Sequence, residues 1–213
     1  MRIVEELLSI NEYTRPGRKR PDTLALILHW VENPGQSAGG VWNYWEYEVA
    51  KLERWASANY VIGLDGEVLS TVPEDEIAYH VGSDGIDPAS GRIYTDWARE
   101  RFGKYAIDYD RWSPNYCTIG IELCHVNWQG RFTEATLDSA RELCGILCHE
   151  WKLDPMREIG THFGVVGCKR CPRWFVERPE EFERFKKEVA GSRMGSSRAV
   201  SIVRTTGRTF NGC

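Results

Sequence analysis

Apolar residues follow one another without interruption in several short stretches, a pattern typical of strands buried on both faces of a sheet. The clearest stretch, at residues 24–30, ends before Asn33-Pro34-Gly35, a strong turn signal. Two shorter stretches flank Asp65-Gly66, which predicts a β-hairpin. The predicted strands are residues 24–30, 59–64, 67–72, 77–81 and 118–124, and a further short strand leads to His162.

Other stretches have apolar residues every three or four positions, which is the spacing of one helix face. We expect helices over residues 2–11, 40–56 and 134–151, and a last helix that begins at Pro179. Thr133 is suited to cap the third helix, because its hydroxyl can accept a hydrogen bond from an amide of the first turn. Strands and helices therefore alternate, which predicts an α/β domain with a central β-sheet and flanking helices.

A long connection at residues 83–116 is rich in Gly, Asp, Pro, Tyr and Trp, and one helical turn is predicted near residues 97–102. A connection of this length in a compact domain is usually a functional lid or a mobile segment. Its aromatic residues have two interpretations: they line a groove for a sugar or peptide, or they cover the core. The residues concerned are Trp97, Tyr105, Tyr109 and Trp112.

Composition narrows the functional classes. The 213 residues include 27 basic and 31 acidic side chains, for a formal net charge of −4, so no nucleic-acid partner is expected. No apolar run approaches the roughly 18 residues of a membrane span. The first 20 residues place Glu5 and Glu6 within their apolar stretch, so they do not read as a signal peptide. Seven cysteines without a leader favour synthesis in the reducing cytoplasm.

Two histidines and a cysteine form the main candidate site. His29 lies near the carboxyl end of a predicted strand, and His162 also follows a strand. A glycine-rich loop after His162 can turn back and bring Cys171 close to it. Two imidazoles and one thiolate suit zinc, and three protein ligands leave a fourth position open for water.

Five motifs in order resemble one enzyme family. They are His29 in its strand, SANYVIGLDGEV at 57–68, AYHVG at 78–82, TIGIEL at 118–123, and His162 followed by the Lys169 and Cys171-Pro172 segment. Together they are similar to the type 2 N-acetylmuramoyl-L-alanine amidases, which share the peptidoglycan-recognition-protein fold and include phage endolysins. The resemblance covers about residues 22–188. It implies a mixed sheet, one zinc ion held by His29, His162 and Cys171, and bacterial peptidoglycan as substrate.

The same resemblance assigns catalytic roles to Glu122 and Lys169. Glu122 stands in an apolar strand and could move a proton between water and the leaving amine, the alternative being an ion pair with an arginine. Lys169 could reach the oxyanion, the alternative being an ordinary solvated lysine. His80 is expected to contact substrate or to make a structural hydrogen bond. Many relatives have histidine where this chain has Asn59, which we expect to contact substrate or to support the site.

Two other functional classes compete with this interpretation. Some proteins of this fold bind peptidoglycan without cutting it, and a Cys168–Cys171 pair could serve thiol redox chemistry. Pro172 and the spacing from His162 argue against the redox class. A catalytic zinc site requires that Cys168 does not bind the metal, because a fourth protein ligand would leave no position for water. His125 and His149 are expected to be peripheral.

The amidase interpretation also divides the chain. Residues 1–190 are expected to form the zinc amidase domain, and residues 191–213 a linker or the start of a C-terminal cell-wall-binding region. Without a signal peptide the protein would reach the cell wall only after release from the cytoplasm, and a holin-type partner would allow this.

Overall fold

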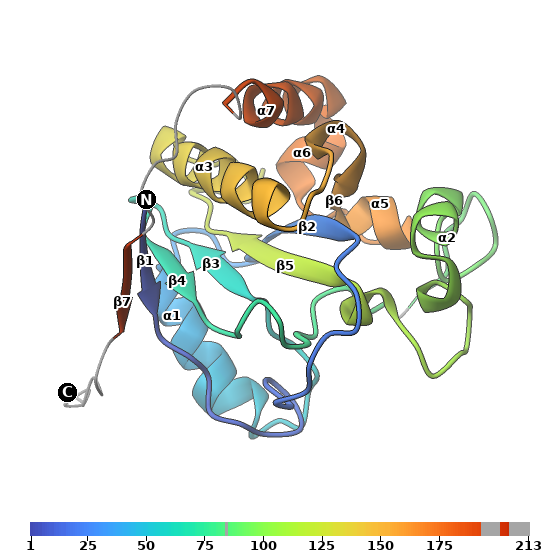
Figure 1. Cartoon of the computed structure of the whole chain (residues 1–213), viewed down its shortest axis with the longest axis horizontal. Helices are drawn as coiled ribbons and strands as arrows, with labels where there is room; N and C mark the ends of the chain where they lie inside the picture. Colours follow the sequence, from blue (N-terminus) through green and yellow to red (C-terminus); the bar gives the residue numbers. More distant parts are fainter. Residues whose placement is uncertain (84, 193–200, 205–213) are drawn as a thin grey trace.

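The computed structural model of the chain describes residues 1–83, 85–192 and 201–204. Within these residues seven strands form one sheet, in the order β6-β2-β5-β3-β4-β1-β7 (Figure 1). The strands are β1 (Arg2–Glu5), β2 (Ala25–Trp30), β3 (Tyr60–Ile62), β4 (Val68–Ser70), β5 (Thr118–Leu123), β6 (Ile159–Thr161) and β7 (Ser201–Arg204). The hairpin partners β3 and β4 are antiparallel and the other pairs are parallel, so the predicted mixed sheet is confirmed.

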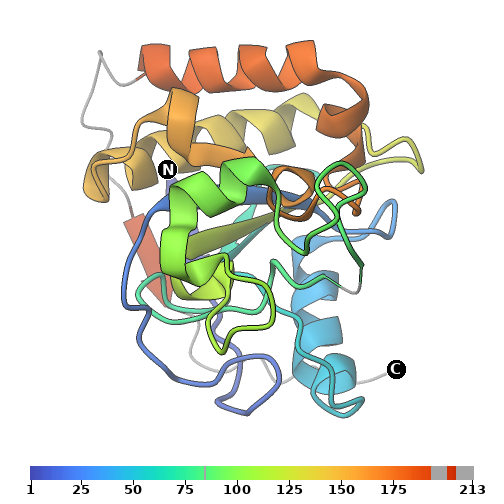
Figure 2. The ribbon, with the colours of Figure 1, turned by 90° about the vertical axis from the view of Figure 1, so that its right-hand side faces the viewer.

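Helices cover both faces of this sheet. They are α1 (Ala38–Asn43), the π-helix η1 (Tyr44–Val49), α2 (Asp96–Phe102), the 3-10 turns η2 (Gly103–Tyr105) and η3 (Pro114–Tyr116), α3 (Glu134–Glu150), α4 (Pro155–Glu158), α5 (His162–Val166), α6 (Arg173–Glu177) and α7 (Pro179–Ser192). Figures 1 and 2 show α3 and α7 stacked on one face of the sheet, and α1 on the other. The α/β class with flanking helices is therefore confirmed.

The two central strands explain which side chains reach which face. Successive residues of a strand point to opposite faces. In β2, Leu26 and Leu28 pack in the core beneath α3 and α7, together with Ile119 and Ile121 of β5. The intervening residue Ile27 packs with α2 and α5. His29 and Glu122 therefore belong to the face that α3 does not cover.

Two predicted helices behave as expected. The hydroxyl of Thr133 accepts a hydrogen bond from the Thr136 amide at 3.0 Å, so α3 begins where its cap predicts. Helix α7 begins at Pro179 and buries Phe185 and Val189. Both helices contribute to the same hydrophobic core.

The prediction of a helix over residues 2–11 is wrong. Residues 2–5 form β1, whose Ile3 and Val4 are buried and which pairs with both β4 and β7. Apolar spacing in so short a segment fits a helix as well as a strand, and the sheet partners decide between them. The helix expected at residues 40–56 is shorter, because the helical segments α1 and η1 end at Val49.

The strand expected near residues 77–81 is absent from the described residues. Ile77 and Val81 are buried, but the backbone here is held by groups other than a neighbouring strand. The side-chain oxygen of Asn115 accepts hydrogen bonds from the amides of both His80 and Val81, at 3.0 Å each. A buried asparagine thus replaces the sheet ladder at this segment.

The described part of the long connection, residues 85–116, packs over the core, so the covering interpretation is correct for most of its aromatic side chains. Tyr105 is buried, and Trp97 and Trp112 pack against the same hydrophobic cluster. Tyr109 is 87% exposed and takes no part in that cluster.

Part of the predicted tail is placed against the domain. Residues Ser201–Arg204 form β7 and pair with β1, and residues 193–200 and 205–213 of the tail lie outside the described residues. Among the helices of the described residues, none combines the length and apolar character needed to cross a membrane.

Candidate metal centre

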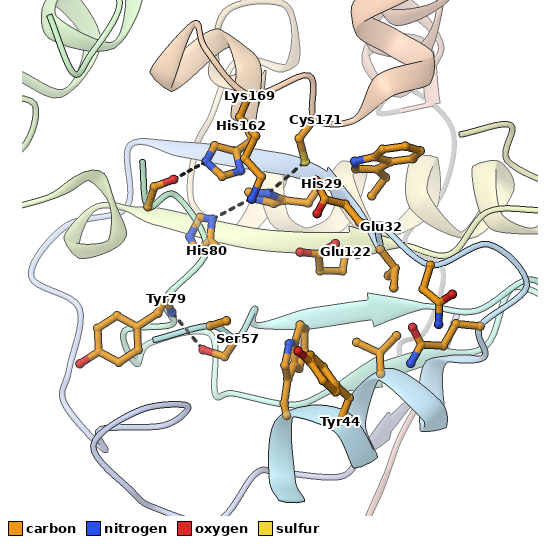
Figure 3. A pocket seen from close by; sticks show the side chains of 18 of the residues that line it. His29, Glu32, Tyr44, Ser57, Tyr79, His80, Glu122, His162, Lys169 and Cys171 are labelled. Carbon is orange, nitrogen blue, oxygen red and sulfur yellow. Dashed lines mark hydrogen bonds between the residues drawn. The ribbon is translucent and has the colours of Figure 1, made fainter. Parts of the chain in front are cut away.

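Three predicted ligands meet at one edge of the sheet. Strands β2, β5 and β6 are mutually parallel, so their carboxyl ends lie together. His29 is near the end of β2, and His162 follows β6 directly. The potential ligand atoms of His29, His162 and Cys171 all lie within 4.8 Å of one another, and all three residues are buried (Figure 3).

The loop that carries Cys171 is folded back by two features. Gly167 ends α5 with a φ of 68°, a left-handed conformation that favours glycine. It also lies so close to the Asp87 carboxylate that a Cβ there would be 2.3 Å from the nearer oxygen. Beyond it, the amide of Phe163 donates a hydrogen bond to the carbonyl of Cys171 at 2.8 Å. The thiol is thereby held beside His29, with its Sγ 3.7 Å from His29 Nδ1.

Hydrogen bonds determine which ring nitrogens are available. His162 Nε2 lies 2.9 Å from the carbonyl oxygen of Gly82, which can only accept, so Nε2 carries the proton and Nδ1 is free. His80 Nε2 lies 3.2 Å from the hydroxyl oxygen of Thr118, and that hydroxyl already donates to the carbonyl of Pro114. His80 Nε2 is therefore a donor.

The neutral His80 ring then has Nδ1 as an acceptor. His29 Nε2 lies 2.9 Å from this atom, so its N–H donates a hydrogen bond to it. The lone pair of His29 is consequently on Nδ1, the atom that faces Cys171. His29 and His162 thus each present an unprotonated Nδ1, which is the form that binds a metal.

The position of His80 depends on Gly120 in β5. A Cβ at Gly120 would lie 2.5 Å from the imidazole ring, so only glycine lets the ring lie against the strand. His80 is buried and borders the cavity described below. The structural hydrogen bond expected as one alternative is present, and substrate contact stays a prediction.

Burial keeps the histidines neutral. Desolvation, with His162 and His80 nearby, holds the pKa of His29 well below its usual range. Desolvation likewise lowers the pKa of His80 to about 3 and that of His162 to about 4. Burial raises the pKa of the Cys171 thiol well above its usual range. Two neutral imidazoles and one thiol, which would lose its proton on binding a metal ion, form a donor set that fits zinc.

Glu122 lies in the same cavity as the three donors. It is half-buried, and within the described residues its Oε2 atom is buried without a hydrogen-bond partner. Burial raises the pKa of Glu122 to about 8, the positive charge of Lys169 opposes this rise, and Glu32 adds to it. An ion pair with arginine, the alternative expected from the sequence, is absent from the described part of the chain. Lys169 is exposed and lines the cavity, as its predicted role requires.

The cavity around this centre has a volume of about 480 Å³. Its other walls come from residues that sequence analysis did not select: Glu32 in the β2–α1 loop, Tyr44 and Trp45 in η1, and Trp55 and Tyr79. Trp45 and Trp55 have helical spacing, which indicates a core face, yet Trp55 is 60% exposed. Tyr44 and Trp45 lie in the π-helix η1, and π-helical turns are frequent at functional sites.

Asn59 does not reach the cavity, so the expected substrate contact is corrected. Its side chain is fully buried. Its amide donates to the carbonyl of Pro73 at 3.1 Å, and its oxygen accepts from the Gly120 amide at 3.1 Å. Asn59 therefore holds the backbone beneath His80.

The remaining candidates lie apart from the three donors. Cys168 is exposed, with its Sγ 3.3 Å from the Ser83 hydroxyl, and does not join the ligand group. His149 is exposed on α3. His125 is buried rather than peripheral, and its ring nitrogens lie 2.7 and 2.6 Å from the carbonyl oxygens of Asn127 and Val31.

Comparison with known proteins identifies the relatives of this chain. The profile of a family described as N-acetylmuramoyl-L-alanine amidase matches residues 19–174. N-acetylmuramoyl-L-alanine amidase BlyA of Bacillus subtilis is 27% identical over 190 residues, which cover 89% of this chain and 47% of BlyA. CwlL of Bacillus licheniformis, also named an N-acetylmuramoyl-L-alanine amidase, is 26% identical over 189 residues, with the same coverage of 89% and 47%. The chain thus spans about half the length of these curated relatives.

Solved structures show the same fold. The solution structure of the PlyG catalytic domain has a TM-score of 0.64 at 16% identity, covering 93% of this chain and 99% of that one. The catalytic domain of XlyA has a TM-score of 0.60 at 18% identity, covering 86% and 98%.

Proposed function

Because the chain belongs to the N-acetylmuramoyl-L-alanine amidase family, we propose that it hydrolyses the amide bond between N-acetylmuramic acid and L-alanine of bacterial peptidoglycan, with one zinc ion per chain. The observation that carries this proposal is the meeting of three buried donors with Glu122 and Lys169 in one cavity. Residues His29, His162 and Cys171 would hold the metal. Zinc, when bound in such a site, supplies a Lewis acid that polarises a carbonyl and makes water more acidic.

Glu122 is the proposed proton carrier. Its buried oxygen has no competing partner among the described residues, so it is free to accept a proton from the attacking water. The same carboxyl then delivers that proton to the nitrogen of L-alanine as the amide bond breaks. Burial raises the pKa of Glu122 toward the neutral range, in which a carboxyl group can both take and give a proton.

Lys169 is the proposed stabiliser of the oxyanion. Its ammonium is exposed toward the cavity and close enough to affect the pKa of Glu122, His29 and His162. A positive charge in this place would favour the negative oxygen that develops when water adds to the carbonyl. His80 acts before the reaction, by fixing which nitrogen His29 presents.

The cellular role proposed here is cell-wall lysis of the endolysin type. The protein would be made in the cytoplasm and would act on the wall after release, with a holin-type protein as the release partner. The chain shares its fold with the catalytic domains of PlyG and XlyA, which is consistent with this proposal.

Mass spectrometry of peptidoglycan digested by the zinc-loaded protein tests the activity. Free stem peptides that begin with the amino group of L-alanine are expected, and a chelator should abolish them. A non-catalytic peptidoglycan-binding module of the same fold is the alternative. Wall binding without any released peptide would establish that alternative and overturn the proposal.

A further inference from the structure

Glu32 is a carboxylate in the cavity that the proposed reaction does not use. It lies three residues after His29, in the loop between β2 and α1, and its side chain is exposed within the cavity. Figure 3 shows Glu32 on one side of Glu122, with Ser57 and Tyr79 on the other. Within the described residues the Glu32 carboxylate has no hydrogen bond and no ion pair.

The backbone around Glu32 is held firmly. The amide of Val31 donates to the carbonyl of Leu123 at 3.2 Å. The carbonyl of Val31 lies 2.6 Å from the ring nitrogen Nε2 of His125, and the carbonyl of His125 accepts from the Gly35 amide at 2.8 Å. The buried His125 thus fixes the loop on both sides of Glu32. Such fixing reduces the entropy lost when the carboxylate binds a ligand.

Among the residues that line the cavity, Glu32 and Glu122 are the two with acidic side chains, and Glu122 already has a role in the proposed reaction. The Glu32 carboxylate is exposed within the cavity, so it can accept hydrogen bonds from a cationic group of the substrate. The neighbouring side chains of Asn33 and Gln36 also line the cavity and offer amide oxygens to the same cation.

We infer that Glu32 recognises a free side-chain ammonium of the stem peptide, and that the protein therefore prefers stems that are not cross-linked. This inference rests on the proposed function. Stem peptides contain a diamino acid whose side-chain amine is free before cross-linking and is acylated afterwards. Acylation removes the positive charge and one donor, so a cross-linked stem cannot pair with Glu32.

Two matched substrates test this inference. One is a soluble muramyl tripeptide with lysine as the third residue, and the other is the same compound with that lysine Nε-acetylated. Measured at pH 7, where the lysine amine is charged, the wild-type kcat/KM should be about five- to tenfold higher for the free amine, with the difference in KM. In E32Q the kcat/KM for the free-amine substrate should fall to the value for the acetylated substrate. The kcat/KM for the acetylated substrate should stay at its wild-type value.

A control variant and the paired design keep the outcomes distinct. E48Q removes the same charge from an exposed position on η1 that does not line the cavity, and it should keep the wild-type preference. If Glu32 acts only by its charge on Glu122, E32Q will change both substrates equally, and the inference is overturned. Equal wild-type rates on the two substrates would also overturn it. Hydrolysis of neither substrate by the wild type would instead count against the proposed function itself.

Discussion

His29 and Glu122 are paired residues on the neighbouring parallel strands β2 and β5. Residues paired in this way point to the same face of the sheet. The strand partners therefore place a metal donor and the proposed proton carrier side by side at the carboxyl ends of both strands. Because this placement depends on backbone pairing, each side chain can be changed without moving the other.

The first prediction concerns the rate. Glu122→Gln keeps the shape of the side chain but cannot carry a proton, so turnover should fall roughly 100-fold or more. Zinc content, measured by atomic absorption, should stay at one ion per chain. A zinc-loaded variant with nearly the wild-type rate would show that Glu122 is not the proton carrier.

The second prediction concerns the pH dependence of stability in the metal-free protein. Burial raises the pKa of Glu122 to about 8 from its ordinary value of 4.5, so the folded state binds more protons than the unfolded state between these values. Stability contributed by Glu122 is therefore present at low pH and is lost as the pH rises through about 8. Glu122→Gln removes this dependence.

Urea unfolding at pH 5 and pH 8 measures this effect. The free energy of unfolding of the wild type, taken relative to Glu122→Gln, should decrease from pH 5 to pH 8. Because His29, His80 and His162 are common to both proteins, their own titration cancels in the comparison. An unchanged difference would mean that Glu122 is not desolvated in solution.

The third prediction separates two neighbouring cysteines. Cys171 lies with His29 and His162, whereas Cys168 is exposed beside Ser83. Cys171→Ser should lose most zinc and activity, and Cys168→Ser should keep one zinc per chain and most of its rate. If both cysteines prove necessary for zinc, the site is closed by four ligands and is structural rather than catalytic.

The fourth prediction tests His80 as a positioning residue. Because its Nδ1 accepts a hydrogen bond from His29 Nε2, His80→Ala should weaken zinc binding by about 10- to 100-fold. Titration with a competing chelator measures this affinity without reference to activity. His149→Ala, at an exposed position on α3, is the matched control and should bind zinc as the wild type does. Unchanged affinity in His80→Ala would remove the proposed role.

The fifth prediction tests the division of the chain. Strand β7 pairs with β1, and Arg204 forms an ion pair with Glu5 at 2.9 Å, but Ile202 is 61% exposed. Little apolar surface is buried by this strand, so ending the chain after Ser192 should lower the thermal midpoint by no more than about 2–4 °C. Activity on soluble muropeptides should be unchanged. A large fall in either quantity would assign the tail to the catalytic domain.

Several features could be predicted from local sequence because their causes are local. The apolar runs at β2 and β5 require burial on both faces, and Thr133 carries the cap of α3 in its own side chain. His29 and His162 followed from their positions at the ends of predicted strands, and Cys171 followed from the loop that turns back after His162, together with the family resemblance. Residues at the ends of successive strands can be expected to lie together, because parallel strands bring their carboxyl ends to one edge of the sheet.

Other features depend on contacts between distant segments. Residues 2–5 became a strand because β4 and β7 pair with them, and Asn115 holds residues 80 and 81 where a strand was expected. The sequence does not reveal that His80 would accept a hydrogen bond from His29, 51 positions away. Nor does it reveal that Glu32 and Trp55 would face the same cavity as the three donors. Residue types and their local spacing determined the strands, the caps and the donor chemistry of this protein. Only the tertiary structure decided hydrogen-bond direction, burial and the charge around the site, since these arise from side chains that meet through folding.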